Sequence, residues 1–167
     1  MSSLKSFGFQ TKWHVMVVVC HTRDIPNLHD RIHVSIDERI ITIFRDKFNK
    51  LSAIDSVCHH AAGPLTMGTL QDIEDLDVTV VLCPHHKYAV SIHDGTKIYQ
   101  AVEIKQGKPV AIGWKRGKTV QRNHNVFEDL ISGEISLTLN QDNIHISSDQ
   151  DSKSTLCAQY FPLHCKI

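Results

Sequence analysis

The sequence lacks a long hydrophobic run, an excess of charge of either sign and a dense set of cysteines. Its longest apolar run, 15–20, is far too short to cross a membrane. Lysine and arginine together number 18, as do aspartate and glutamate, so the net charge favours neither a nucleic-acid partner nor a membrane partner. The five cysteines are an odd number and are widely spaced. This spacing excludes the disulfide framework of a small secreted domain and favours a reducing compartment, with the cytoplasm as first choice.

The amino-terminal segment allows two interpretations. Residues 1–23 contain Lys5, Lys12 and Arg23, several hydroxyl residues and no acid, a composition that a mitochondrial transit segment could have. The β-branched residues of 13–20 favour instead a first strand of the fold, which is what we expect. With 167 residues, the chain suits one domain, 1–167, that is large enough to bury a substantial core.

Short runs of β-branched and apolar residues, separated by turn residues, predict an all-β fold. The candidate strands are 13–20, 27–37, 40–45, 51–54, 77–82, 88–92, 119–127, 134–139 and 143–147. The runs 40–45 and 51–54 are expected to pair as a hairpin across a polar turn. Evidence for helices is thin, because even 27–37 alternates as a strand does. The polar segment 147–154 predicts a loose link to the end of the chain.

Two short motifs place cysteine beside histidine, and they are Cys58-His59-His60 and Cys83-Pro84-His85-His86. Read as C-x-H and C-x-x-H, they offer two thiolates and two imidazoles from two loops. Such a set can hold a tetrahedral structural zinc ion. It can also hold a [2Fe–2S] cluster in which two histidines replace two cysteines on one iron. Ordinary loop residues are the remaining alternative, but two such pairs with prolines close by rarely arise by chance.

The sequence resembles the Rieske [2Fe–2S] domain family in its segments 58–65 (CHHAAGPL) and 83–86 (CPHH). Within that family it is most similar to the small soluble Rieske-domain ferredoxins of animals, which have counterparts of 83–88, of Trp114-Lys115 and of Val120-Gln121-Arg122. The resemblance covers residues 13–147 and is weakest over the C-terminal residues.

This resemblance implies a fold and a ligand set. The fold would be three stacked antiparallel sheets, with a cluster-binding subdomain, 56–95, inserted in a larger base and a C-terminal extension over 148–167. The implied ligands are Cys58 and Cys83 for an inner iron, and His60 and His86 for an outer iron near the surface. His59 and His85 match positions of the motif that do not bind.

The resemblance also implies a function. The chain would carry one [2Fe–2S] cluster and move single electrons as a soluble, monomeric carrier that is not itself an enzyme. A flavin reductase would be its electron donor, and an oxygenase or a similar protein its acceptor. A zinc-stabilised interaction module that uses the same four ligands is the alternative. An oxygenase is not expected, because the chain has no room for a second, catalytic domain.

Departures from the respiratory members of the family predict a low redox potential. Those proteins join their two loops by a disulfide, and the matching positions here are Gly63 and His85. Their serine and tyrosine hydrogen-bond donors would fall at Tyr88 and Val90, and neither position matches. Fewer donors stabilise the reduced cluster less. We therefore expect the low end of the Rieske range, near about −150 mV.

Two charged segments have no assigned role. The acidic segment 71–77 is expected to be an extended surface loop, with an acidic docking edge as the alternative. The segment 105–122 has six cations, no acid and an interleaved tryptophan. Such a pattern can bind nucleic acid, but glycine-rich spacing favours a solvated basic hairpin. A landing patch for an acidic redox partner is a further possibility, because complementary charge speeds association.

Overall fold

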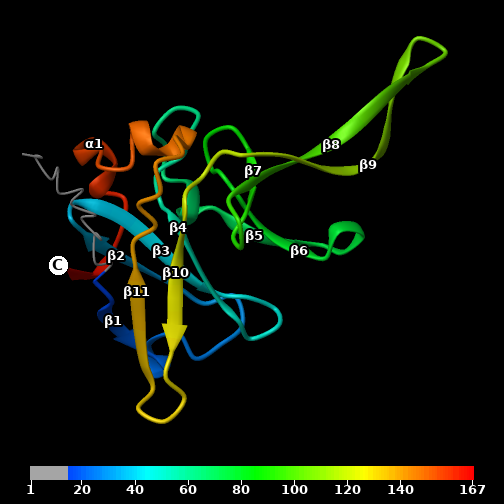
Figure 1. Cartoon of the computed structure of the whole chain (residues 1–167). Coiled ribbons are helices and arrows are strands. Elements are labelled where there is room, and N and C mark those ends of the chain that lie inside the picture. The colour runs from blue at the N-terminus through cyan, green and yellow to red at the C-terminus, as the bar shows by residue number, and fades with distance from the viewer. Residues whose placement is uncertain (1–14) are drawn as a thin grey trace, which may run out of the picture.

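The computed structural model describes residues 15–167 and consists mainly of two β-sheets (Figure 1). The seven-stranded base sheet has the order β1-β11-β10-β4-β3-β2-β12, and the five-stranded second sheet has the order β5-β6-β7-β8-β9. The strands are β1 (Val17–His21), β2 (Arg31–Ile36), β3 (Arg39–Arg45), β4 (Leu51–Asp55), β5 (Thr69–Ile73), β6 (Val78–Leu82), β7 (Ala89–Ser91), β8 (Thr96–Lys105), β9 (Lys108–Thr119), β10 (Asn123–Glu128), β11 (Glu134–Thr138) and β12 (Leu163–Lys166). Helical structure in the described residues is limited to short 3₁₀ turns and one turn of α-helix, α1 (Thr155–Ala158). The all-β prediction is confirmed.

Strand β10 joins the two halves of the base sheet. It pairs with β11 through residues 125–128 and with β4 through Asn123 and His124. Strand β10 thus links two of the three sheets that the family resemblance implies into one hydrogen-bonded sheet. The expected hairpin 40–45/51–54 is confirmed as the antiparallel pair β3–β4, in which Ile43 lies opposite Ala53.

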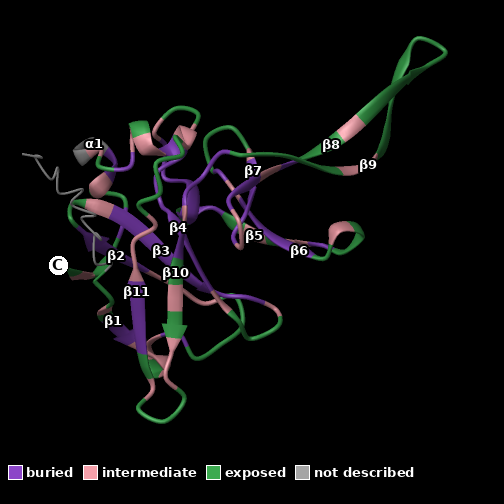
Figure 2. Ribbon diagram, in the orientation of Figure 1, coloured by how far each residue is buried: buried purple, intermediate pink, exposed green. Residues whose placement is uncertain are grey.

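Two buried apolar clusters hold the sheets together. The first lies within the base and includes Ile25, Val34 and Ile41, none of which is exposed to solvent. The second joins the base to the second sheet, and its buried members are Phe44, Ile54, Cys58, Leu65, Val81, Cys83, Val90, Ile92 and Val120. Figure 2 shows this buried interior in purple and the far half of the β8–β9 hairpin in green. Both motif cysteines thus belong to the apolar core between the sheets.

The candidate strands did not include β5, β8, β9 or β12. Strand β5 covers 71–73 of the segment 71–77, which was expected to be an extended loop, and Gln71 lies opposite Val80 of β6. The rest of this acidic segment forms a 3₁₀ turn, Glu74–Leu76, which ends at Asp77. Strand β12 pairs in parallel with β2, with Cys165 opposite Val34. The C-terminal residues are therefore part of the base sheet.

The region between β11 and α1 differs from its prediction. Residues 143–147 form no strand; a 3₁₀ turn over Ser147–Gln150 follows. The expected loose link 147–154 is wrong for a physical reason: Ser148 is fully buried and donates a hydrogen bond to the Asp55 carboxylate at 2.6 Å. Polar residues here are satisfied by buried partners rather than by water.

The amino-terminal interpretations are tested only in part. Strand β1 lies within the expected first strand 13–20, but Trp13 and most of the segment 1–23 lie outside the described residues. Among residues 15–167, no helix has the length and apolar character that a membrane span needs.

Candidate metal centre

The two cysteine–histidine motifs lie in two loops with the same backbone device. In loop one, residues 56–66, the Cys58 N–H donates to the Gly63 carbonyl at 2.8 Å and the Ala62 N–H donates to the Cys58 carbonyl at 3.0 Å. In loop two, residues 83–88, the Cys83 N–H donates to the Tyr88 carbonyl and the Lys87 N–H donates to the Cys83 carbonyl, both at 2.9 Å. Each loop thus curls around its cysteine.

The fourth residue after each cysteine has a left-handed backbone. Ala62 has a φ of 50° and Lys87 a φ of 59°, a conformation that costs a residue with a Cβ about 1–2 kcal/mol. This turn lets the chain reverse directly after the motif. The two loops therefore have similar backbone conformations. They differ in the position of the histidine, which is the second residue after the cysteine in loop one and the third in loop two.

Burial separates the four candidate ligands into an inner and an outer pair. Cys58 is 2% exposed and Cys83 is 1% exposed, whereas His60 and His86 are exposed. The imidazole rings of the two histidines contact each other edge to face, with their centres 4.9 Å apart. Two thiols in the core and two imidazoles at the surface thus come together from separate loops.

The two thiols influence each other's ionisation. Their interaction is the main cause of opposite shifts: it raises the pKa of Cys58 above its usual range and lowers the pKa of Cys83 to about 5. Backbone N–H groups of both loops also point at the sulfurs, from His60 and Ala61 toward Cys58 and from His85 and His86 toward Cys83. Such donors favour thiolate, the form that binds metal.

The doubled histidines, His59 and His85, lie differently from their neighbours. The ring of His85 packs over Gly63, where an added Cβ would come within 2.7 Å of its Nδ1 atom. This contact brings together the two positions at which respiratory relatives were expected to carry their disulfide. His59 is half-buried beside the Tyr88 ring, and its Nδ1 atom is buried without a hydrogen-bond partner.

Three residues without an assigned role support the loops. Fully buried Gln121 donates from Nε2 to the carbonyls of Asp55 and Val57, just before Cys58. The Tyr88 ring lies 4.6 Å from the His60 ring, and the Lys97 ammonium lies 4.6 Å from the Tyr88 ring centre. Gln121 and Tyr88 lie in segments that resemble the family, but no sequence pattern reveals these contacts.

The arrangement fits a binuclear cluster that takes two ligands on each iron. The donors form one thiol pair and one imidazole pair, which is the division that a Rieske centre uses. Among residues 15–167, no group of three or more His, Cys, Asp or Glu side chains is arranged to hold a single metal ion.

Comparisons with known proteins agree with this chemistry. The family described as soluble Rieske-type ferredoxin matches residues 12–142. A human Rieske domain-containing protein is 33% identical over 123 residues, which cover 72% of this chain and 73% of that protein.

Solved structures show the same fold at low identity. One is described as an NADH-dependent nitrite reductase small subunit from Mycobacterium tuberculosis; it has a TM-score of 0.56 and 15% identity, and the match covers 78% of this chain and all of that one. A quaternary ammonium Rieske monooxygenase has a TM-score of 0.53 and 20% identity over 82% of this chain. The match spans only 34% of the monooxygenase.

Proposed function

Because the chain belongs to the soluble Rieske-type ferredoxin family, we propose that it is a one-electron carrier whose [2Fe–2S] cluster is bound by Cys58, Cys83, His60 and His86. Electron transfer is the function that this family implies, and its members generally bind a [2Fe–2S] cluster. The observation that carries the ligand assignment is the burial gradient, with both thiols in the core and both imidazoles at the surface.

The residues around the cluster would divide their work. The buried thiolates would hold the inner iron away from water, and backbone N–H groups of both loops would stabilise the sulfurs. The exposed imidazoles of His60 and His86 would form the route by which electrons enter and leave. The cluster supplies one reversible electron, and the chain itself catalyses no bond-making step.

We further propose a low potential, near about −150 mV within the Rieske range. The contact between Gly63 and His85 supports this value, because an interloop disulfide cannot form at these positions. Tyr88 places its ring against the two histidines of loop one rather than matching the serine donor of respiratory relatives. A measured midpoint above about +100 mV, still within that range, would contradict this proposal.

The chain would form one Rieske domain, with 56–95 as its cluster-binding subdomain and 148–167 as an extension. Rieske-type domains are associated with reductases and oxygenases, as the named neighbours illustrate. We therefore propose a flavin reductase as donor and an oxygenase or similar protein as acceptor, for a monomeric carrier. Cys20, Cys157 and Cys165, which are not proposed ligands, are free thiols, and this supports a reducing compartment such as the cytoplasm.

The test is the spectrum and metal content of the purified protein. We expect two irons and two sulfides per chain, visible absorption that bleaches on reduction, and an electron paramagnetic resonance signal of the Rieske type. His86→Ala should abolish that signal, whereas the matched control His85→Ala should keep it. A colourless protein with one zinc per chain would instead support the zinc-stabilised module.

A further inference from the structure

Strands β8 and β9 form a long hairpin that projects away from the rest of the molecule (Figure 1). We define residues 96–119 as the arm. Its outer half is exposed (Figure 2), with Val102 at 60% and Ile104 at 66% of full exposure. A two-stranded hairpin with nothing packed on it is at best marginally stable. Exposed apolar residues on such an element indicate a surface that binds a partner.

The two faces of the outer arm differ in character. Val102 pairs with Ala111, and Ile104 pairs with Pro109, so these side chains share one face. The other face carries the pairs Glu103–Val110 and Lys105–Lys108. The arm is therefore an amphipathic ribbon, apolar on one face and mainly charged on the other.

Positive charge is concentrated on the arm. Its six cations are Lys97, Lys105, Lys108, Lys115, Arg116 and Lys118, and its one acid is Glu103. The arm thus has a net charge of +5, and because the whole chain is neutral, the remaining residues carry −5. An apolar strip flanked by lysines is complementary to an apolar surface with an acidic rim.

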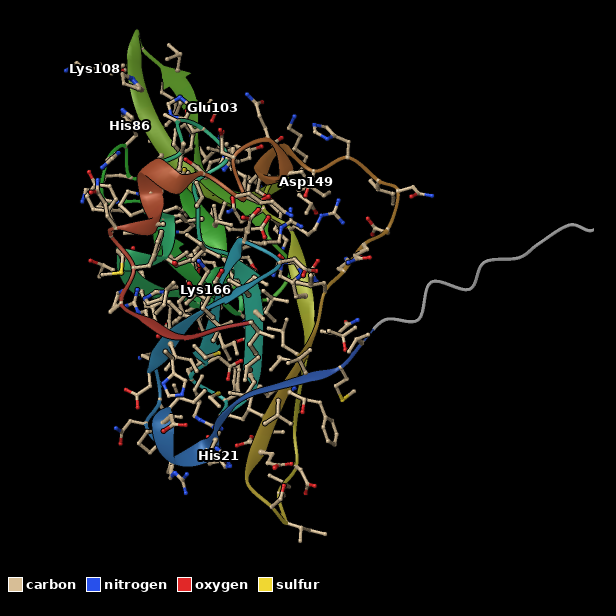
Figure 3. The ribbon with its side chains drawn as sticks, turned by 90° about the vertical axis from the view of Figure 1, so that its left-hand side faces the viewer. His21, His86, Glu103, Lys108, Asp149 and Lys166 are labelled. Atoms are coloured by element: carbon tan, nitrogen blue, oxygen red, sulfur yellow. The ribbon has the colours of Figure 1, made fainter. Side chains whose placement is uncertain are left out.

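The base of the arm lies beside the candidate metal centre. The Lys97 ammonium contacts the ring of Tyr88, and that ring contacts His60. In Figure 3, His86 lies at the same end of the molecule as Lys108 and Glu103 of the arm. A protein that lies along the arm would therefore reach toward the exposed imidazoles.

The free edge of β9 is guarded against simple strand addition. Strand β9 is an edge strand, and it contains Pro109, which has no N–H to donate. A β-bulge interrupts the ladder near Gly113, whose φ is 115°. Bulges, prolines and lysines are the devices by which edge strands avoid pairing with other chains. Recognition would therefore use the side chains of the arm rather than its backbone.

We propose that the arm is the docking element for an electron-transfer partner protein with an acidic rim around an apolar surface. This inference rests on the proposed function. Val102 and Ile104 would pack on the apolar surface, and the lysines would pair with its rim. In each encounter one electron passes, so the partner is oxidised by one electron as this chain is reduced by one.

A lipid surface fits the arm less well than a protein does. The tip, 105–108, consists of Lys105, Gln106, Gly107 and Lys108 and has no apolar side chain. Insertion of the tip would bring two charged groups into hydrocarbon first, which is costly. The apolar strip runs along the side of the arm, where a protein surface can cover it.

The test measures how fast reduced flavodoxin, a small acidic flavoprotein, reduces the cluster-loaded protein in a stopped-flow experiment. One variant combines Lys105→Glu, Lys108→Glu and Lys115→Glu. Its matched control combines Lys50→Glu, Lys153→Glu and Lys166→Glu, which changes the net charge equally but away from the arm. At low salt we expect the arm variant to react about tenfold more slowly or worse, and the control to stay within about twofold of the parent.

Added salt should narrow the difference, because it screens exposed charges. Reduction by free reduced riboflavin, which has no docking surface, should proceed at one rate in all three proteins. A second variant, Val102→Ser with Ile104→Ser, changes exposed positions only, and we expect it to slow the flavodoxin reaction severalfold at every salt concentration.

Three results would overturn the docking proposal. The first is an arm variant that reacts as fast as the parent, and the second is an arm variant that is slowed no more than its control. The third is binding of the parent to vesicles of phosphatidylserine and phosphatidylcholine through the arm lysines, with an unchanged flavodoxin rate in the arm variant, which would indicate a lipid surface. A colourless protein would reject the proposed function, and the docking proposal with it, whereas a coloured protein with equal rates would reject docking alone.

Discussion

Loop one and loop two contain the same turn but differ in their contacts with the rest of the protein. Loop one is joined to the base: the Ser56 N–H donates to the Ile40 carbonyl at 2.9 Å, and the Thr42 hydroxyl donates to Thr66 at 2.6 Å. Loop two closes on itself through Cys83 and Tyr88, and its residues 84–87 are exposed. The same backbone turn therefore positions candidate ligands in two settings: in loop one it is hydrogen-bonded to the base, and in loop two it is held mainly by its own hydrogen bonds.

The foundation of loop one continues into a buried charged network. Asp55, the last residue of β4, is fully buried and forms an ion pair with Arg39 at 3.2 Å. His124 donates to it from Nε2 at 3.0 Å, a tautomer fixed by the Asn140 N–H, which donates to the Nδ1 atom of the same ring. A buried carboxylate with several partners is a costly group to disturb. A substitution that destabilises the base should therefore destabilise loop one more than loop two.

The largest expected effect comes from Asp55→Asn. This change breaks the ion pair with Arg39, which keeps only Asp149, and it weakens the hydrogen bonds that Ser148 and His124 donate to the buried charge. We therefore expect a loss of about 3–5 kcal/mol in the free energy of unfolding. Native-state hydrogen exchange should show lower protection at Cys58 and Ala62 than at Cys83.

The matched control is Asp75→Asn, an exposed acid that should stay within about 0.5 kcal/mol of the parent. Equal loss of protection in the two loops would break the contrast between them.

An intermediate effect is expected on acidification, through Asp149. Partial burial alone would raise the pKa of this carboxyl, but hydrogen bonds from Arg122 and from the Ile146 N–H, together with the charge of Arg39, hold the pKa at about 2. Its folded pKa is thus below the unfolded value of about 3.9. The stabilisation is present above pH 4 or so and is lost as the pH falls toward about 2, and it amounts to about 2 kcal/mol.

Asp149→Asn should remove this dependence, as measured by thermal unfolding across that pH range. Because Arg122 and Arg39 also contact the network under loop one, the acid-induced loss should appear at loop one first. A parent protein and a variant with the same pH profile would show that Asp149 makes no such contribution.

The smallest effect concerns the left-handed turn that the loops share. Lys87→Gly relieves the backbone cost of its positive φ without removing a buried side chain, and we expect a gain of at most about 1 kcal/mol in stability. Ala62→Gly should gain less, since the Ala62 methyl group packs against the buried cluster that contains Val57 and Phe161. Melting temperatures of the two variants measure this, and a larger gain in loop one would contradict its firmer foundation.

The sequence predicted the strands whose apolar residues are β-branched and contiguous, such as those of β3 and β6. It did not predict β5, in which the adjacent residues Gln71 and Asp72 are both polar. Gln71 lies on the face open to solvent, whereas Asp72 on the other face accepts a hydrogen bond from buried Thr79. The segment 27–37 was rightly expected as a strand in its second half, because Ile32, Val34 and Ile36 alternate and form β2.

The candidate site shows the same division. The thiols and imidazoles could be predicted from the two motifs, because each motif places a cysteine and a histidine within three residues of each other. Gln121 and Ser148, which support loop one from far along the chain, could not be predicted, because a lone polar residue does not reveal that it is buried. Only tertiary contacts turn such residues into supports.

The tip of the arm offers a place for a probe. Gln106 and Gly107 have φ values of 51° and 75°, and nothing lies within 4 Å of the position that a Cβ on Gly107 would take. Four of the native thiols are buried and the fifth is half-buried. The substitution Gln106→Cys would therefore create the most accessible thiol of the described chain. A fluorophore attached there would report the approach of another protein without touching the core.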